Sequence, residues 1–230
     1  MRAKIYLFAA VCLVGVSVFT FAQTRNDPLM TESVVLITST GCRTAETRTV
    51  GTLIEGGLIL TVAHGVVGQT LNQITTARGT VFEASIAAID IELDLALLKL
   101  KDVSESQLST PLRLAPAEPG ERVSFVAFNE QQQFIRDAKI KRRLKINTQD
   151  IYLENKTSRP GLEVELEVNV GNSGGPLINK YGEVVGIVWS TSRVVNNRSW
   201  ATRSEAVSAL LATTSANTSP RNGKALACTG

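Results

Sequence analysis

Three short segments of this 230-residue chain carry side chains that could act together as a nucleophile, a base and an acid. In chain order they read Thr61-Val62-Ala63-His64, Asp94-Leu95-Ala96-Leu97-Leu98 and Gly171-Asn172-Ser173-Gly174-Gly175-Pro176-Leu177. A serine hydroxyl becomes a nucleophile when a base takes its proton, and a carboxylate holds an imidazole base in the productive tautomer. His64 is the only histidine in the chain, so it is the single candidate for that base. We therefore expect Ser173 to act with His64 and Asp94.

The order of these side chains excludes one fold that the glycine-rich segment would otherwise fit. Gly171 to Gly175 match the pattern G-x-S-x-G, which in α/β-hydrolases is a strand-to-helix turn followed by the acid and then the histidine. No histidine follows Ser173, and Pro176 with the apolar pair after it favours a strand rather than a helix there. The remaining order, histidine before aspartate before serine, is that of chymotrypsin.

The three segments resemble those of the trypsin-like serine peptidases, most closely the HtrA-like branch, over about residues 34–211. As in that branch, a Leu-Thr strand end precedes the histidine, and Asn rather than Asp precedes the serine. The resemblance implies an all-β fold of two six-stranded antiparallel β-barrels with a short C-terminal helix. It implies that His64 is the general base, Asp94 the acid that orients it and Ser173 the nucleophile. The backbone N–H groups of Gly171 and Ser173 would form the oxyanion hole.

Asp90 is the alternative acid, four residues before Asp94. We favour Asp94 because it directly precedes an apolar strand, as the motif requires. A zinc site is disfavoured, because one histidine and two cysteines outside the N-terminal segment make a poor ligand set. We expect no metal and no cofactor.

The residue before the nucleophile separates this chain from the digestive trypsins. In those enzymes an aspartate at this position pairs with a newly freed α-amine, and the pairing forms the oxyanion turn. Asn172 is neutral and makes no such ion pair, so we expect no activation by N-terminal insertion. HtrA-like proteases usually continue into a PDZ domain. Fewer than 20 residues follow the helix predicted here, so we expect none.

The substrate pocket is expected between the segment before the nucleophile and a later strand. Its candidate lining residues are Glu167, Val168, Asn169, Trp189, Ser190 and Thr191. A peptide would bind beside the last three as an added strand. Glu167 lies six residues before Ser173, where trypsins place a pocket carboxylate, and would then favour Arg or Lys substrates. We prefer the alternative, in which Glu167 is a solvated residue of an alternating strand and the pocket takes a small or medium apolar residue.

Short apolar runs separated by turn residues indicate an all-β chain with two halves. Strands are expected at residues 34–37, 50–54, 58–61, 81–89, 95–100, 123–128, 162–168, 177–178 and 184–188. The first barrel would span about 30–110, a proline-rich linker 111–120 and the second barrel about 121–203. A short helix would follow over 204–212, completing a peptidase domain of residues 30–212, and a polar tail would follow over 213–230.

Residues 1–22 form a predicted signal peptide, with basic Arg2 and Lys4 before a long apolar run. An uncleaved membrane anchor is the alternative, and without it we expect no stable membrane association. We expect a secreted or periplasmic protein, whose oxidising surroundings permit a disulfide between Cys42 and Cys228, although two unrelated thiols remain the alternative. Loss of the leader lowers the formal charge from +3 to +1, which does not indicate a nucleic-acid partner.

These features predict an exported serine endopeptidase that acts on peptides or proteins through an acyl-enzyme. Two other functions remain open. A relative that lacks activity would use the same fold to bind a partner, and an esterase would use the same three side chains on small acyl groups.

Overall fold

The structure is a computed structural model that describes residues 31–42, 44–104, 108–215 and 227–229. The predicted leader, residues 1–22, lies outside these residues. Within the described ranges, no helix is both long and apolar enough to cross a membrane.

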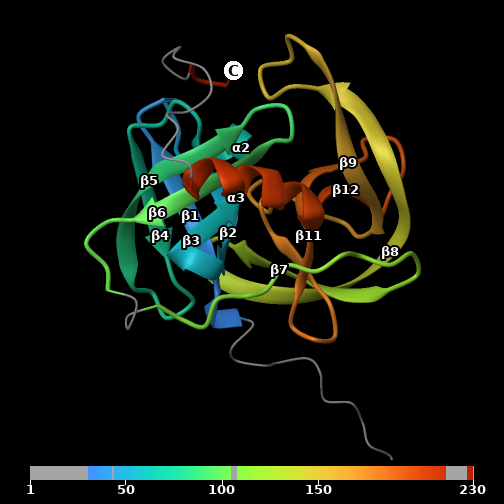
Figure 1. Cartoon of the computed structure of the whole chain (residues 1–230), viewed down its shortest axis with the longest axis horizontal. Coiled ribbons are helices and arrows are strands. Elements are labelled where there is room, and N and C mark those ends of the chain that lie inside the picture. Colours follow the sequence, from blue (N-terminus) through green and yellow to red (C-terminus); the bar gives the residue numbers. More distant parts are fainter. Residues whose placement is uncertain (1–30, 43, 105–107, 216–226, 230) are drawn as a thin grey trace, which may run out of the picture.

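The first half of the chain forms a closed six-stranded barrel (Figure 1). Its strands are β1 (Val34–Thr40), β2 (Thr47–Ile54), β3 (Leu58–Thr61), β4 (Leu71–Thr75), β5 (Val81–Asp90) and β6 (Leu95–Leu100). They close in the order β1-β2-β3-β6-β5-β4, and all neighbours are antiparallel. The predicted hairpin between β2 and β3 is present. Gly56 and Gly57 make the turn at φ +80° and +68°, which glycine adopts without steric strain.

The second half forms another closed six-stranded barrel. Its strands are β7 (Arg122–Asn129), β8 (Gln132–Gln149), β9 (Lys156–Glu165), β10 (Pro176–Ile178), β11 (Val184–Thr191) and β12 (Arg198–Arg203). They close in the order β10-β11-β12-β9-β8-β7. The predicted fold of two six-stranded antiparallel barrels is therefore confirmed. Strands β4 and β12 were not expected from the sequence.

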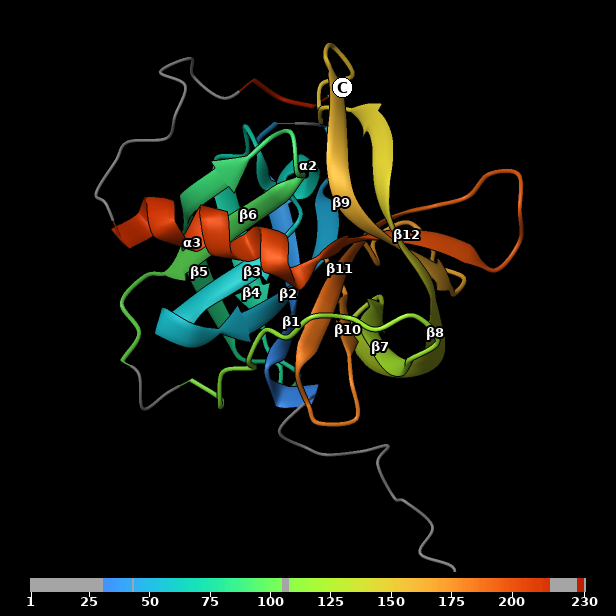
Figure 2. The same ribbon diagram turned by 45° about the vertical axis from the view of Figure 1, so that its right-hand side comes forward.

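Two segments join the barrels to each other. The segment 111–120 is held on one side by Leu112 N–H, which donates to Leu53 O of β2 at 2.9 Å, and on the other by Val184 N–H of β11, which donates to Arg113 O at 2.8 Å. After β12 a 3-10 turn, η3 (Ser204–Ala206), leads into helix α3 (Val207–Ser215), which lies across β5 and β6 of the first barrel (Figures 1 and 2). The chain thus returns from the second barrel to cover the first.

Strands β1, β3 and β6 of the first barrel are buried on both faces over most of their length, which explains their continuous apolar runs. In β1, Val35 and Ile37 pack inside the barrel, while Val34 and Leu36 belong to a cluster shared with the second barrel and α3. The second barrel contributes Phe125, at its centre and fully buried, to that shared cluster. The core therefore runs through the contact between the barrels, where the predicted functional segments also meet.

Candidate active site

His64 lies on a single helical turn that follows β3. The turn, α2 (Ala63–Val66), has buried residues on both sides of the histidine, while the His64 side chain is 33% exposed. Gly65 lets the turn lie directly on β2, because a Cβ there would come within 2.2 Å of Thr49 Cγ2. The backbone is thus held against the barrel, and the imidazole remains accessible.

Asp94 holds both the ring and the backbone of His64. Asp94 Oδ2 lies 2.8 Å from His64 Nδ1, and Asp94 Oδ1 accepts the His64 backbone N–H at 2.9 Å. The carboxylate side chain is only 4% exposed. Because a carboxylate accepts a proton donor at Nδ1, the neutral ring carries its hydrogen there and leaves Nε2 free to act as a base.

Asp90, the alternative acid, has a different role in the structure. Its Oδ1 accepts the backbone N–H groups of Glu92 at 3.0 Å and Leu93 at 2.8 Å. These bonds cap the turn that leads to Asp94, where the backbone has φ +57°. Asp90 therefore shapes the turn from which Asp94 reaches His64.

Ser173 lies in a turn that is tied to both barrels. Its carbonyl accepts Val50 N–H of β2 at 2.8 Å, and Gly174 N–H donates to Val188 O of β11 at 2.7 Å. Gly174 has φ +88°, and a Cβ there would lie 2.0 Å from Val50 O, so only glycine fits. The Ser173 hydroxyl donates to Trp189 O at 3.4 Å.

The neutral Asn172 holds the same turn with uncharged partners. The side chain is buried, its Nδ2 donates to Phe128 O at 2.9 Å and its Oδ1 accepts Asn169 N–H at 3.1 Å. Gly171, with φ +92°, precedes it. Across the described residues, neither Gly171 N–H nor Ser173 N–H donates to a protein acceptor. Two adjacent donors are therefore available to an incoming oxygen.

The candidate pocket residues fall into two groups. Val168 is buried, whereas Glu167 and Asn169 are exposed, and the Glu167 carbonyl accepts Arg136 Nη1 at 2.5 Å. Of the three glutamates in the alternating run, Glu163 is the buried one and forms ion pairs with two arginines. On β11, Ser190 is half-buried and Thr191 is exposed.

The Trp189 side chain, predicted to line the pocket, is half-buried and contacts an arginine. Its ring is stacked against the guanidinium of Arg159, with Cζ 4.5 Å from the ring centroid. Arg159 also lies 3.5 Å from Asp94 Oδ2, measured from Nη1. Arg159 was not predicted from the sequence, because a single arginine in a strand resembles an ordinary surface residue. Its only local signal is that it directly precedes Pro160.

A groove lined in part by Asn169, one of the predicted pocket residues, opens beside Gly171. It has a volume of about 950 Å³ and lies between the two barrels. The first barrel lines it with Ala45 to Arg48, and the second with residues of the β7–β8 hairpin and with 169–172. A chain bound at Ser173 therefore has room on this side of the nucleophile.

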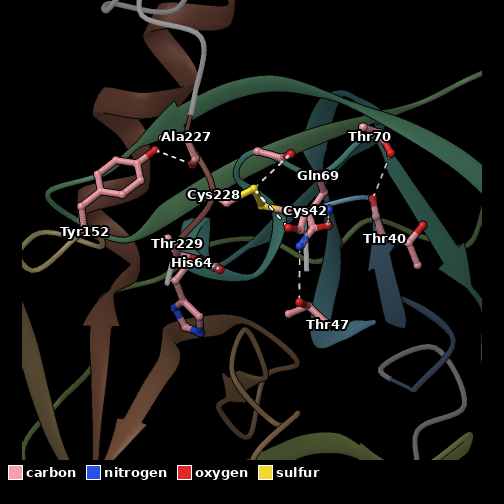
Figure 3. Close-up of a disulfide and its surroundings, with 11 residues drawn as sticks. Thr40, Cys42, Thr47, His64, Gln69, Thr70, Tyr152, Ala227, Cys228 and Thr229 are labelled. Carbon is pink, nitrogen blue, oxygen red and sulfur yellow. Dashed lines mark hydrogen bonds between the residues drawn. A yellow bond between two sulfur atoms is a disulfide. The ribbon is translucent and has the colours of Figure 1, made fainter. Parts of the chain in front are cut away.

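The predicted disulfide is present and lies behind His64. Cys42 and Cys228 are bonded across 186 residues of sequence, with their Cα atoms 5.6 Å apart (Figure 3). Beyond the bond, Thr229 Oγ1 donates to His64 O at 3.0 Å. Before it, Ala227 O accepts the Tyr152 hydroxyl at 3.1 Å. The C-terminal segment therefore contacts both the histidine turn and the second barrel.

In the described part of the chain, no group of three or more His, Cys, Asp or Glu side chains is placed to hold a metal ion.

Comparisons with known proteins agree with this geometry. A family model, "Trypsin-like peptidase domain", matches residues 49–187. Human serine protease HTRA4 is 30% identical over 158 residues, which cover 69% of this chain and 33% of HTRA4. Mouse serine protease HTRA4 is 29% identical over 208 residues, covering 90% and 41%. The chain thus spans well under half the length of these curated relatives.

Solved structures extend the likeness to nearly the whole chain. The active form of the Rv3671c protease from M. tuberculosis superposes with a TM-score of 0.79 at 24% identity, covering 99% of this chain and 100% of that one. Its inactive form gives a TM-score of 0.69 at 26% identity, covering 82% and 93%. The first likeness establishes the fold alone. Because the family model covers more than half of the chain, the predicted resemblance is confirmed, and this protein belongs to the family of trypsin-like serine peptidases.

Proposed function

We propose that this protein is an endopeptidase that cleaves peptide bonds with Ser173, His64 and Asp94. The observation that carries the proposal is the double contact of Asp94 with His64, at 2.8 Å to the ring and 2.9 Å to the backbone. Such a contact presents Nε2 as the base, and the order of the three residues is that of the chymotrypsin triad.

In the first half of the reaction, His64 takes the Ser173 proton as Oγ attacks the substrate carbonyl. The present bond from Ser173 Oγ to Trp189 O is 3.4 Å long and weak, so it opposes rotation of the hydroxyl toward the imidazole very little. The imidazolium then protonates the leaving amine, and an acyl-enzyme remains. Water attacks this ester in the second half, with His64 again acting as base and then as acid.

The tetrahedral intermediates carry negative charge on the former carbonyl oxygen. We assign the backbone N–H groups of Gly171 and Ser173 as its donors, each worth about 3 kcal/mol in the transition state. Asn172 orients them through its bonds to Phe128 and Asn169, without an ion pair. The turn therefore needs no freed α-amine, and no activation by N-terminal insertion is required.

The substrate binds as an extended strand along β11, with its acyl side near Ser190 and Thr191 and its amine side in the groove beside Gly171. Exposed Glu167 and buried Val168 favour a small or medium apolar residue before the cleaved bond over Arg or Lys. Peptides or proteins are the substrates. Residues 1–22 direct export to a secreted or periplasmic location, which the Cys42–Cys228 disulfide supports because such bonds persist in oxidising compartments.

A fluorophosphonate probe followed by a peptide-library digest tests the proposal. We expect labelling of the native protein, none of Ser173→Ala, and full labelling of Ser158→Ala, whose hydroxyl only bonds Asn147 within the β8–β9 hairpin. Absence of labelling in the native protein would instead indicate a binding module. If the protein is labelled and hydrolyses esters but not peptides, it is an esterase. Cleavage after Arg or Lys would support Glu167 as the carboxylate of the substrate pocket.

A further inference from the structure

Arg159 of β9 is a buried cation, and two of its three polar partners lie on the turn that carries Asp94. The residue is only 3% exposed. Its Nε donates to Glu92 O at 2.7 Å, its Nη2 donates to Gln149 O at 3.1 Å, and its Nη1 lies 3.5 Å from Asp94 Oδ2. A guanidinium placed so deeply requires partners of this kind to offset the loss of water.

The flat face of Arg159 contacts the strand beside the nucleophile. Arg159 Cζ lies 4.5 Å from the centre of the Trp189 ring. Among the described residues the Trp189 indole N–H has no acceptor, so the cation–π contact, rather than a hydrogen bond, holds the ring. The carbonyl of the same tryptophan accepts the Ser173 hydroxyl. Arg159 thus lies between the proposed acid and the acceptor of the proposed nucleophile.

The second barrel also holds the turn before Asp94 at three successive carbonyls. Ile91 O accepts Ile151 N–H at 3.1 Å, Glu92 O accepts Arg159 Nε at 2.7 Å and Leu93 O accepts Thr202 Oγ1 at 3.3 Å. Asp94 then has φ +57°, a left-handed conformation that L-residues adopt when surrounding contacts impose it. These bonds come from the other barrel, so the second barrel contributes directly to the position of Asp94.

We propose that Arg159 is a positioning residue that fixes the Asp94 carboxylate from the second barrel and thereby sets the charge that His64 meets. The inference rests on the proposed function of the three residues. Asp94 Oδ2 is shared between His64 Nδ1 at 2.8 Å and Arg159 Nη1 at 3.5 Å, so the shorter bond orients the ring while the cation anchors the carboxylate from behind.

The charged groups that raise the pKa of this cation are three carboxylates. Burial lowers the pKa of Arg159, while Asp94, Asp90 and Asp150 raise it, and a guanidinium keeps its proton under these conditions. Removing the cation strengthens the field of Asp94 at His64 and removes a repulsion from the protonated ring. Both changes favour imidazolium, so the protonation midpoint of His64 should rise.

The single histidine makes a direct test available. The full chain is labelled with 13C and 15N histidine, carries no histidine tag, and its imidazole is titrated by NMR. In Arg159→Met the midpoint should rise by about 0.5–1 pH unit. Arg142→Met is the control, because Arg142 pairs with Glu163 of its own barrel, and the His64 midpoint should not move in this variant. A folded Arg159→Met protein with an unchanged midpoint overturns the proposal.

If Arg159→Met does not fold, Arg159→Lys is used to test the proposal by the same NMR measurement of His64. A lysine keeps the positive charge, but it lacks the planar guanidinium whose separate N–H groups donate to Glu92 O and approach Asp94 at the same time. We expect a shifted Nδ1–H resonance of His64, and a spectrum superimposable on the native one would refute a positioning role. Kinetics add a second readout, in which kcat should fall about tenfold or more while KM changes little. Failure of the proposed function is seen separately, as absence of probe labelling in the native protein.

Discussion

Replacing Gly174 with alanine should uncouple the nucleophile turn from the first barrel. The new Cβ would lie 2.0 Å from Val50 O and 2.7 Å from Thr61 Oγ1. Neither atom belongs to a flexible side-chain end, because Val50 O is backbone and Thr61 Oγ1 is bonded to that same oxygen at 2.7 Å. The turn must therefore move, and the bond from Val50 N–H to Ser173 O is the first contact at risk.

The magnitude follows from two separable terms. Alanine at φ +88° costs about 1–2 kcal/mol in any setting. Displacing the turn loses about two buried hydrogen bonds, at about 1 kcal/mol each. We expect Gly174→Ala to lose about 3–4 kcal/mol of unfolding free energy. Probe labelling should slow by about 100-fold or more, because a displacement of 1 Å at a nucleophile has that effect.

Gly120→Ala is the matched control. Gly120 has nearly the same φ, +85°, but nothing lies within 4 Å of the point that a Cβ would occupy. Gly120→Ala therefore has the cost of a left-handed backbone without the steric clash. This variant should lose about 1–2 kcal/mol of unfolding free energy, and its rate of probe labelling should not change. Urea unfolding followed by tryptophan fluorescence measures the first quantity, and the rate of fluorophosphonate labelling measures the second. Equal stability losses in the two variants, with equal labelling, would refute the argument from close contact.

Three further predictions concern the acid, the disulfide and a buried loop carboxylate. Asp94→Asn should lower kcat about 10⁴-fold in a folded protein, whereas Asp90→Asn should reduce stability and leave kcat within about threefold; a large kcat loss in the second variant would contradict their division of roles. Reducing the Cys42–Cys228 bond should lower the unfolding free energy by about 2–4 kcal/mol in urea titrations, with no added effect of reductant on the double Cys→Ser variant. Burial raises the pKa of Asp150, but hydrogen bonds from its own loop outweigh burial and hold that pKa below the ordinary 3.8. The group therefore stabilises the fold above pH 3.8, so the stability difference between native protein and Asp150→Asn should shrink as the pH falls below that value, and a constant difference would count against the assignment.

The strands missing from the sequence-based expectation show where local pattern fails. In β4 and β12 polar side chains occupy many of the buried positions, namely Asn72, Ser199 and Thr202, so the apolar period is weak. Glu163 illustrates the same limit from the opposite side. Its alternation with apolar neighbours predicts a solvated side chain, yet Arg142 and Arg198 from adjacent strands bury it as an ion-paired group.

The sequence by itself determined the chemistry and the class of fold. A single histidine, an aspartate before an apolar strand and a serine between glycines are local features, and glycine positions such as Gly174 report backbone needs that no other residue meets. Such features can be identified from the sequence alone because each depends only on residues next to it in the chain.

Only the tertiary structure decided which distant groups share a contact. The pairing of Cys42 with Cys228, the stacking of Trp189 on Arg159 and the approach of Arg159 to Asp94 all join segments that the chain separates widely. Their partners are chosen by strand register and by the closure of the two barrels, which no local pattern encodes. The acid that orients the histidine therefore comes from the first barrel, while the second barrel adds contacts to it and to the turn before it, through Ile151, Arg159 and Thr202.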